Sequence, residues 1–159
     1  MKSLFGRWPR NEQTMGQILA LDLGTRRIGL AVSDELALTA QGLPTLERQN
    51  FRADLDRLAD IIRDRTVERI VLGDPKRMSG EAGKQSEWVR DFAGRLEKRF
   101  GLPIEFWDER LTSREAERTL RGSGIAHSDR KAAIDRLSAV LLLQSYLDAR
   151  QIRHEESHT

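Results

Sequence analysis

The 159-residue chain contains no cysteine. Disulfide frameworks, thiolate-bound zinc and cysteine nucleophiles are therefore excluded, and the chain is compatible with a reducing cytosol. No run of about 18 uncharged apolar residues occurs, and residues 1–16 lack the apolar core of a signal peptide. We therefore expect a cytoplasmic protein that neither crosses a membrane nor is secreted.

The sequence also lacks a large excess of charge of either sign. Its net charge is +2 at pH 7. This whole excess falls within residues 1–16, whose charged side chains are Lys2, Arg7, Arg10 and Glu12. Because acidic and basic residues balance in the rest of the chain, a globally basic clamp for nucleic acid is excluded. Any site for a polyanion must be a local patch.

Short apolar runs predict the strands of a layered α/β protein. Residues 17–23 and 27–34 flank the turn-like sequence Gly24-Thr25-Arg26 and predict a β-hairpin. Further strands are predicted over residues 43–46, 69–73 and 104–107. Because the hairpin comes first and later strands alternate with helices, we predict a mixed sheet whose early strands pair antiparallel and whose later strands pair parallel.

Apolar residues at helical spacing predict the helices. The first covers about 15 residues from residue 51, with Asn50 as its N-cap. The second lies around residues 88–96, and the third begins at a capping box that starts with Thr112. The last spans residues 132–149 and is apolar enough to lie flat on the sheet.

These elements fit one domain over residues 17–149. Residues 1–16 are expected to form a disordered N-terminal extension, and residues 150–159 a frayed C-terminal tail. Trp88 and Trp107 lie on predicted core faces, so we expect them to pack inside the protein and not to stack on nucleic-acid bases.

Acidic residues stand where open α/β sheets gather ligands, beyond the carboxyl ends of strands. Asp22 lies late in the first predicted strand, and Asp108 and Glu109 directly follow residues 104–107. Asp135 lies in the apolar last helix, where an unpaired carboxylate is costly. Three convergent carboxylates suit Mg²⁺ or Mn²⁺ and are typical of phosphodiester hydrolysis with one ion or two.

The same acids also have a purely structural interpretation. The acids at the strand ends would then cap a turn or pair with Arg110, and Asp135 would pair with Lys131 one helical turn earlier. The residues alone leave both interpretations open.

Three motifs resemble those of one nuclease family. Residues 20–34 read Ala-Leu-Asp-Leu-Gly-Thr-Arg-Arg-Ile-Gly-Leu-Ala-Val-Ser-Asp, and residues 108–113 read Asp-Glu-Arg-Leu-Thr-Ser. The third motif combines Asp135 and Ala139 with Gln-Ser-Tyr-Leu at residues 144–147. In their order and spacing over about residues 17–149, they resemble the YqgF family of pre-16S rRNA nucleases, which are related to the RuvC-type Holliday junction resolvases.

The resemblance implies a ribonuclease H-like α/β fold, a mixed five-stranded sheet flanked by helices. It also implies that Asp22, Glu109 and Asp135 are the catalytic residues and the ligands of Mg²⁺ or Mn²⁺. The family pattern favours Glu109 over Asp108, and only one of these neighbours can easily face the site. The implied activity is processing of the 5′ end of pre-16S rRNA in the cytoplasm, with pre-rRNA or branched DNA and ribosomal particles as partners.

Basic residues near the motifs are candidate contacts to nucleic-acid phosphates. They are Arg26, Lys76, Arg77 and Lys131. The backbone amides of Gly24 and Thr25 are also expected to approach a phosphate closely.

One loop departs from the family pattern. The family reads Gly-Leu-Pro after its fourth strand, whereas this chain reads Gly73-Asp74-Pro75. Asp74 is therefore either a surface variation or an additional charge near the metal site.

Three other functions are compatible with the same residues. A Holliday junction resolvase-like DNA endonuclease would use the same acids on a different substrate. A non-catalytic nucleic-acid or ribosome-binding module would use them only structurally, although the balanced charge weakens this alternative. Asp22-Leu23-Gly24-Thr25 also resembles the first phosphate loop of sugar kinases and actin, but such ATPases need two lobes around one nucleotide.

Overall fold

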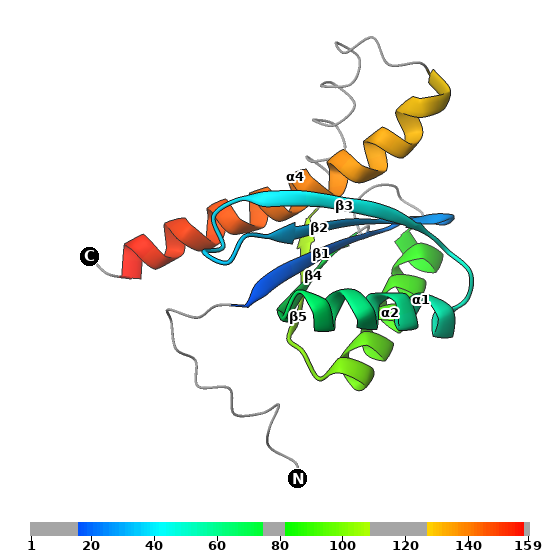
Figure 1. Cartoon of the computed structure of the whole chain (residues 1–159), viewed down its shortest axis with the longest axis horizontal. Helices are drawn as coiled ribbons and strands as arrows, with labels where there is room; N and C mark the ends of the chain where they lie inside the picture. The colour runs from blue at the N-terminus through cyan, green and yellow to red at the C-terminus, as the bar shows by residue number, and fades with distance from the viewer. Residues whose placement is uncertain (1–15, 75–81, 109–126, 158–159) are drawn as a thin grey trace.

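The fold is a mixed five-stranded sheet with helices on both of its faces (Figure 1). The computed structural model describes residues 16–74, 82–108 and 127–157, and it describes the side chains of the second and last helices from residues 87 and 137 onward. The strands are β1 (Gln17–Leu23), β2 (Arg27–Ser33), β3 (Ala40–Glu47), β4 (Val67–Asp74) and β5 (Ile104–Asp108). All five predicted strands are thereby confirmed, with shifts of a few residues at their ends.

The order of the strands across the sheet is β3-β2-β1-β4-β5. β1, β2 and β3 pair antiparallel, whereas β4 pairs parallel with β1 and β5 pairs parallel with β4. The predicted mixed sheet is confirmed. Because β1, β4 and β5 run in the same direction, their carboxyl ends meet at one edge of the sheet.

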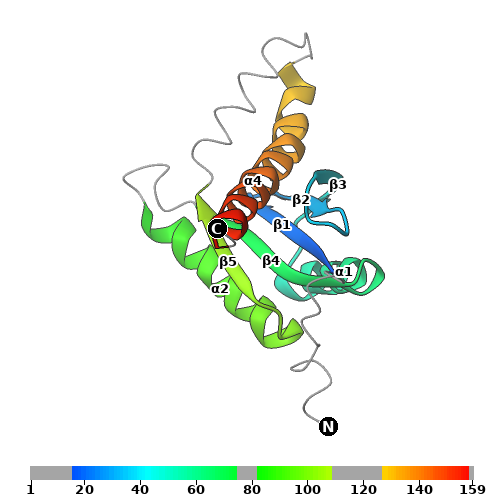
Figure 2. The ribbon, with the colours of Figure 1, turned by 90° about the vertical axis from the view of Figure 1, so that its left-hand side faces the viewer.

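The described helices are α1 (Phe51–Asp64), α2 (Ala82–Phe100) and α4 (His127–Ser157). The helices α1 and α2 cover one face of the sheet, and α4 crosses the opposite face (Figure 2). The helix expected from Thr112 lies outside the described residues. Among the residues that the structure describes, no helix is both long and apolar enough to cross a membrane.

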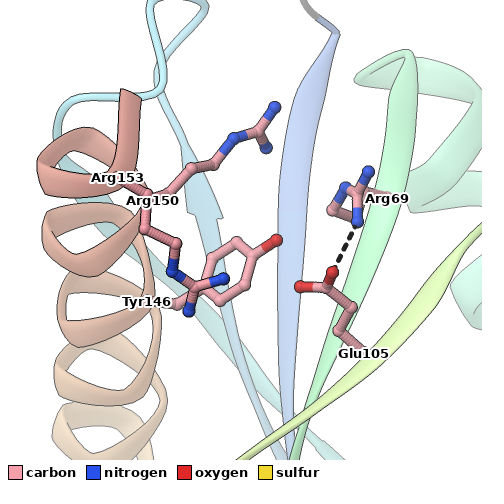
Figure 3. A pocket seen from close by; sticks show the side chains of 5 residues that line it. All are labelled: Arg69, Glu105, Tyr146, Arg150 and Arg153. Atoms are coloured by element: carbon pink, nitrogen blue, oxygen red, sulfur yellow. Dashed lines mark hydrogen bonds and ion pairs between the residues drawn. The ribbon is translucent and has the colours of Figure 1, made fainter. Parts of the chain in front are cut away.

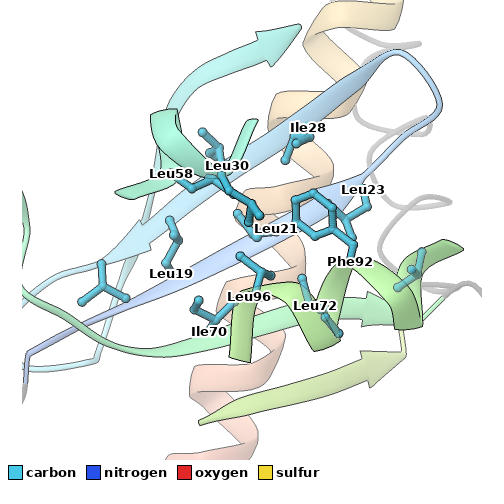
Figure 4. Close-up of a cluster of buried hydrophobic side chains, with 14 of the residues drawn as sticks. Leu19, Leu21, Leu23, Ile28, Leu30, Leu58, Ile70, Leu72, Phe92 and Leu96 are labelled. Carbon is cyan, nitrogen blue, oxygen red and sulfur yellow. The ribbon is translucent and has the colours of Figure 1, made fainter. Parts of the chain in front are cut away.

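The central strand β1 is buried on both faces. Leu19, Leu21 and Leu23 belong to the larger core cluster beneath α1 and α2 (Figure 4). Ile18 and Ala20 belong to the smaller cluster beneath α4. Since successive strand residues point to opposite faces, this pattern allows only one register for β1.

The helix α1 begins at a side-chain cap, as predicted. The Oδ1 atom of Asn50 accepts a hydrogen bond from the backbone N–H of Ala53 at 2.9 Å. Phe51 then packs against Trp88 and Phe92 of α2, with ring centroids 6.4 and 5.9 Å away. The expectation that Trp88 is a core residue is confirmed, since it packs against the larger core cluster.

The helix α4 is longer than the predicted range of 132–149. It is helical from His127 to Ser157, so residues 150–157 form regular helix where we expected a frayed tail. The side chains of residues 151–157 are exposed, as their polarity indicates. Helix-favouring residues such as Gln151, Glu155 and Glu156 extend the helix beyond its apolar part.

We predict that Asn50→Ala lowers the free energy of unfolding by about 1 kcal/mol, because the N–H of Ala53 loses its acceptor. Urea unfolding followed by circular dichroism measures this change. The control is Asn50→Ser, which retains a capping oxygen and should stay close to the wild type. Equal stability of Asn50→Ala and the wild type would contradict the assigned role of the cap.

Candidate active site

The carboxyl ends of β1, β4 and β5 bring three acidic residues to one edge of the sheet. Asp22 is the penultimate residue of β1, and Asp74 and Asp108 are the last residues of β4 and β5. Asp74 and Asp108 are partners in the parallel register of β4 and β5. The predicted position of Asp22, late in the first strand, is confirmed.

These three acids do not all lie on the same face of the sheet. Ile18 and Ala20 pack toward α4, so the alternation along β1 places Asp22 on that face. Trp107 also packs toward α4, and therefore Asp108, the next residue of β5, lies on the opposite face. Asp74 follows the alternation of Ile70 and Leu72 and lies toward α1 and α2, away from the face of Asp22.

Trp107 fixes the orientation of β5 against α4. Its ring makes an edge-to-face contact with Tyr146, with centroids 5.4 Å apart, and its Nε1–H donates to Oγ of Ser145 at 3.1 Å. The expectation that Trp107 is a packing residue is confirmed. The same contacts exclude Asp108 from the face of Asp22, because neighbouring residues of a strand cannot point to the same side.

Asp22 lies between two glycines in the sheet. On one side, its register partner in β2 is Gly29. On the other side, Leu21 pairs with Leu72, so the next residue of β4 alongside Asp22 is Gly73. Asp22 itself is half-buried. The neighbouring strands therefore place no side chain directly beside this carboxylate on the face of α4.

The helix α4 runs antiparallel to β1, β4 and β5. Its C-terminal residues Arg150 and Arg153 approach Arg69 near the start of β4, whereas Tyr146 lies against Trp107 further along the sheet. The N-terminal half of α4 therefore extends toward the carboxyl ends of these strands (Figure 1). Asp135 belongs to this half, four residues before the fully buried Ala139.

The predicted triad is only partly within the described residues. Glu109 lies outside them, and for Asp135 the structure describes the helical backbone but not the side chain. In the described part of the chain, no three acidic or histidine side chains gather as a group that could hold a metal ion. The joint placement of the three carboxylates stays a prediction.

The turn between β1 and β2 is tighter than an open phosphate loop. The N–H of Gly24 donates to the backbone oxygen of Arg27 at 2.9 Å, and a Cβ at Gly24 would lie 2.8 Å from that oxygen. A glycine is required at this position because of this close approach. The expectation that the Gly24 amide approaches a phosphate is wrong, since the turn itself uses this donor.

Arg48 is a residue of this turn region that the sequence analysis missed. Its guanidinium donates to the backbone oxygens of Gly24 at 3.2 Å and Thr25 at 2.9 Å. The same group lies 3.7 Å from the centroid of the Trp88 ring. Burial lowers the pKa of Arg48, and the charge of Asp54 partly opposes this shift. Arg48 thus connects the aromatic core to the turn that follows Asp22.

The expected phosphate contacts are not gathered by the described residues. Arg26 is exposed in the β1–β2 turn, close in sequence to Asp22. Lys76 and Arg77 lie outside the described residues, and Lys131 lies in α4 without a described side chain. Of these four residues, only Arg26 has a described side chain.

The sheet order, with helices on both faces, defines a ribonuclease H-like α/β fold. A solved RuvC structure from T. thermophilus in complex with a Holliday junction substrate has this fold, at a TM-score of 0.55 and 15% identity, covering 86% of this chain and 96% of that one. A second T. thermophilus RuvC structure matches at a TM-score of 0.52.

The chain belongs to the RuvX family, which is described as Holliday junction resolvase and matches residues 16–149. A relative from Koribacter versatilis is 55% identical over 141 residues, covering 89% of this chain and 92% of its own length. One from Bacillus subtilis is 44% identical over 135 residues, covering 84% and 98%. Both carry the name "Putative pre-16S rRNA nuclease". The resemblance to the YqgF nuclease family is confirmed.

We predict that Arg48→Met lowers the free energy of unfolding by about 1–2 kcal/mol, because two backbone oxygens of the turn lose their donor. Urea unfolding provides the measurement. Arg48→Lys is the matched control, since it keeps one charged donor and should lose less stability. Unchanged stability of Arg48→Met would show that the turn does not depend on this contact.

Proposed function

We propose that this nuclease hydrolyses phosphodiester bonds with Mg²⁺ or Mn²⁺ held by Asp22, Glu109 and Asp135. The observation that carries the proposal is the position of Asp22 at the carboxyl edge, on the face of α4 and between Gly29 and Gly73. Oxygen ligands of this kind suit hard divalent cations.

Helical spacing supports the assignment of Asp135. The residues of α4 that pack on the sheet include Ala139, Leu142, Leu143 and Tyr146. Position 135 precedes Ala139 by one helical turn and so continues this stripe toward the carboxyl edge. A carboxylate in such a stripe is stabilised by a bound cation, since burial without compensation is costly.

Strand alternation supports Glu109 over Asp108. Trp107 packs toward α4 and Asp108 belongs to the other face. One further residue of extended backbone would return Glu109 to the face of Asp22. Strand alternation at Asp108 and the family pattern therefore both favour Glu109 as the proposed ligand.

A divalent ion at this site would supply a deprotonated attacking water and would stabilise the leaving oxygen. The chain's own part would be to hold the ion with three carboxylates beside the scissile phosphate and to neutralise the neighbouring phosphates with basic side chains. For the latter role we propose Arg26, Lys76, Arg77 and Lys131. Asp74 and Asp108 lie on the other face, so we assign neither of them to the metal.

We propose pre-16S rRNA as the substrate, with cleavage at its 5′ end in the cytoplasm and contacts to ribosomal particles. The names of the Koribacter and Bacillus relatives support this choice. A four-way DNA junction is the second candidate, because the family description is Holliday junction resolvase. Both substrates need the same phosphodiester chemistry.

We predict that Asp22→Asn lowers metal-dependent cleavage about a thousandfold or more, because it removes a charged metal ligand. Cleavage is measured with Mg²⁺ and with Mn²⁺ on an RNA that carries the 5′ end of pre-16S rRNA, and in parallel on a four-way DNA junction. The substrate that the wild-type protein cuts faster identifies the preferred class.

Thermal unfolding of the Asp22→Asn protein controls for folding, and its Tm should stay close to that of the wild type. Undiminished cleavage by a folded Asp22→Asn protein would overturn the proposed mechanism. Metal-independent binding without cleavage by the wild type would instead favour a non-catalytic module.

We predict a clear difference between two neighbouring substitutions. Glu109→Gln should lower the cleavage rate as much as Asp22→Asn does. Asp108→Asn should retain most of the activity, because Asp108 lies on the other face of the sheet. Single-turnover cleavage assays compare the two proteins. The reverse order of activities would assign the metal to Asp108.

A further inference from the structure

A second polar site lies on the same face of the sheet as Asp22 but toward the opposite end of β4. It is a pocket of about 200 Å³ between α4 and the strands β4 and β5. Its lining consists of Arg69, Glu105, Tyr146, Arg150 and Arg153, whose side chains converge in Figure 3. Arg69 and Glu105 lie near the starts of their strands, so the pocket is remote from the carboxyl edge.

The lining carries more positive than negative charge. Three guanidinium groups face a single carboxylate. That carboxylate, Glu105, is engaged within the pocket by Arg69 at 3.0 Å and by the hydroxyl of Tyr146. Burial, followed by the hydrogen bond to Glu105, raises the pKa of Tyr146.

Arg150 and Arg153 add two positive charges from successive turns of α4 (Figure 3). Arg153 is exposed, and its guanidinium lies 5.9 Å from the centroid of the Trp107 ring. Planar guanidinium groups that converge on one hollow match the geometry of a phosphate, which accepts two parallel hydrogen bonds. The chain as a whole is nearly balanced in charge, so this cluster is a local patch for an anion.

We propose that this pocket binds a backbone phosphate of the nucleic-acid substrate at a distance from the cleavage site. The inference rests on the proposed nuclease site. Asp135 and Arg150 are both residues of α4, and the helix rises about 1.5 Å per residue, which separates them by about 22 Å. This length corresponds to about six or seven nucleotides of one strand in a B-form DNA duplex, and to slightly more in an A-form RNA duplex, whose rise per base pair is smaller.

The location favours a polynucleotide over a free anion. The pocket and Asp22 share the face of α4, so a duplex that enters at the carboxyl edge and follows α4 passes over both. Arg153 is solvent-exposed, which suits contact with a long, already hydrated backbone. A substrate would then contact the pocket only if it has a structured segment that extends beyond the scissile phosphate.

Binding of two RNA duplexes tests this proposal. Fluorescence anisotropy without divalent metal measures the affinity for a duplex of about 20 base pairs, which spans both sites, and for one of about 4 base pairs, which spans only one. The variant protein is Arg150→Gln with Arg153→Gln. The matched control is Arg52→Gln with Arg90→Gln, which removes the same charge from α1 and α2 on the other side of the sheet.

For the long duplex, we expect the pocket variant to bind about tenfold more weakly and to lose about 1–2 units of the slope of log affinity against log salt. The short duplex, which without divalent metal can contact only the pocket, should bind weakly to the wild type and more weakly still to the pocket variant, whereas the control protein should bind both duplexes as the wild type does. Arg153→Gln alone is the second variant, since removal of an exposed side chain leaves the fold intact.

Equal affinities of the wild type, the pocket variant and Arg153→Gln for the long duplex would overturn the proposal, as would an equal loss in the control protein. A wild type without measurable duplex binding would overturn it as well. These outcomes do not depend on cleavage, so a failure of the pocket is distinguishable from a failure of the metal site, which Asp22→Asn tests.

Discussion

The double-sided burial of β1 is the constraint on which the rest of the structure depends. Leu19, Leu21 and Leu23 fill the core beneath α1 and α2, while Ile18 and Ala20 fill the core beneath α4. A slip of one residue would exchange both sets of side chains, so the register is strongly determined. This alternation places Asp22 on the face of α4.

The helix α4 connects two regions of opposite charge on that face. Its N-terminal half extends toward the carboxyl edge, where Asp22 lies between two glycines. Its C-terminal half carries Arg150 and Arg153 over the starts of β4 and β5. In this nearly neutral protein, the proposed contact to a polyanion therefore depends on a small basic patch and not on a globally basic surface. We propose the acidic edge for the metal ion and the basic patch for a phosphate.

Much of the fold follows from local pattern. Short apolar runs predicted all five strands, and Asn50 predicted the start of α1, because strand alternation and helix capping involve residues only a few positions apart. The length of α4 was underestimated, since its last turns are exposed and lack the apolar spacing that marks a packed helix. The structure also corrected the expectation for Gly24. Its backbone N–H donates to the backbone oxygen of Arg27 within the turn and is not directed at a phosphate.

For the site, the sequence by itself determined which acids follow which strands, and the motifs around them determined the family. Only the tertiary structure decided that Asp108 and Asp22 lie on opposite faces, because the contact of Trp107 with Tyr146 sets the orientation of β5. The roles of Arg48 and of the basic pocket likewise depend on residues far apart in the chain. Such contacts follow from how strands and helices pack, and no local spacing encodes them.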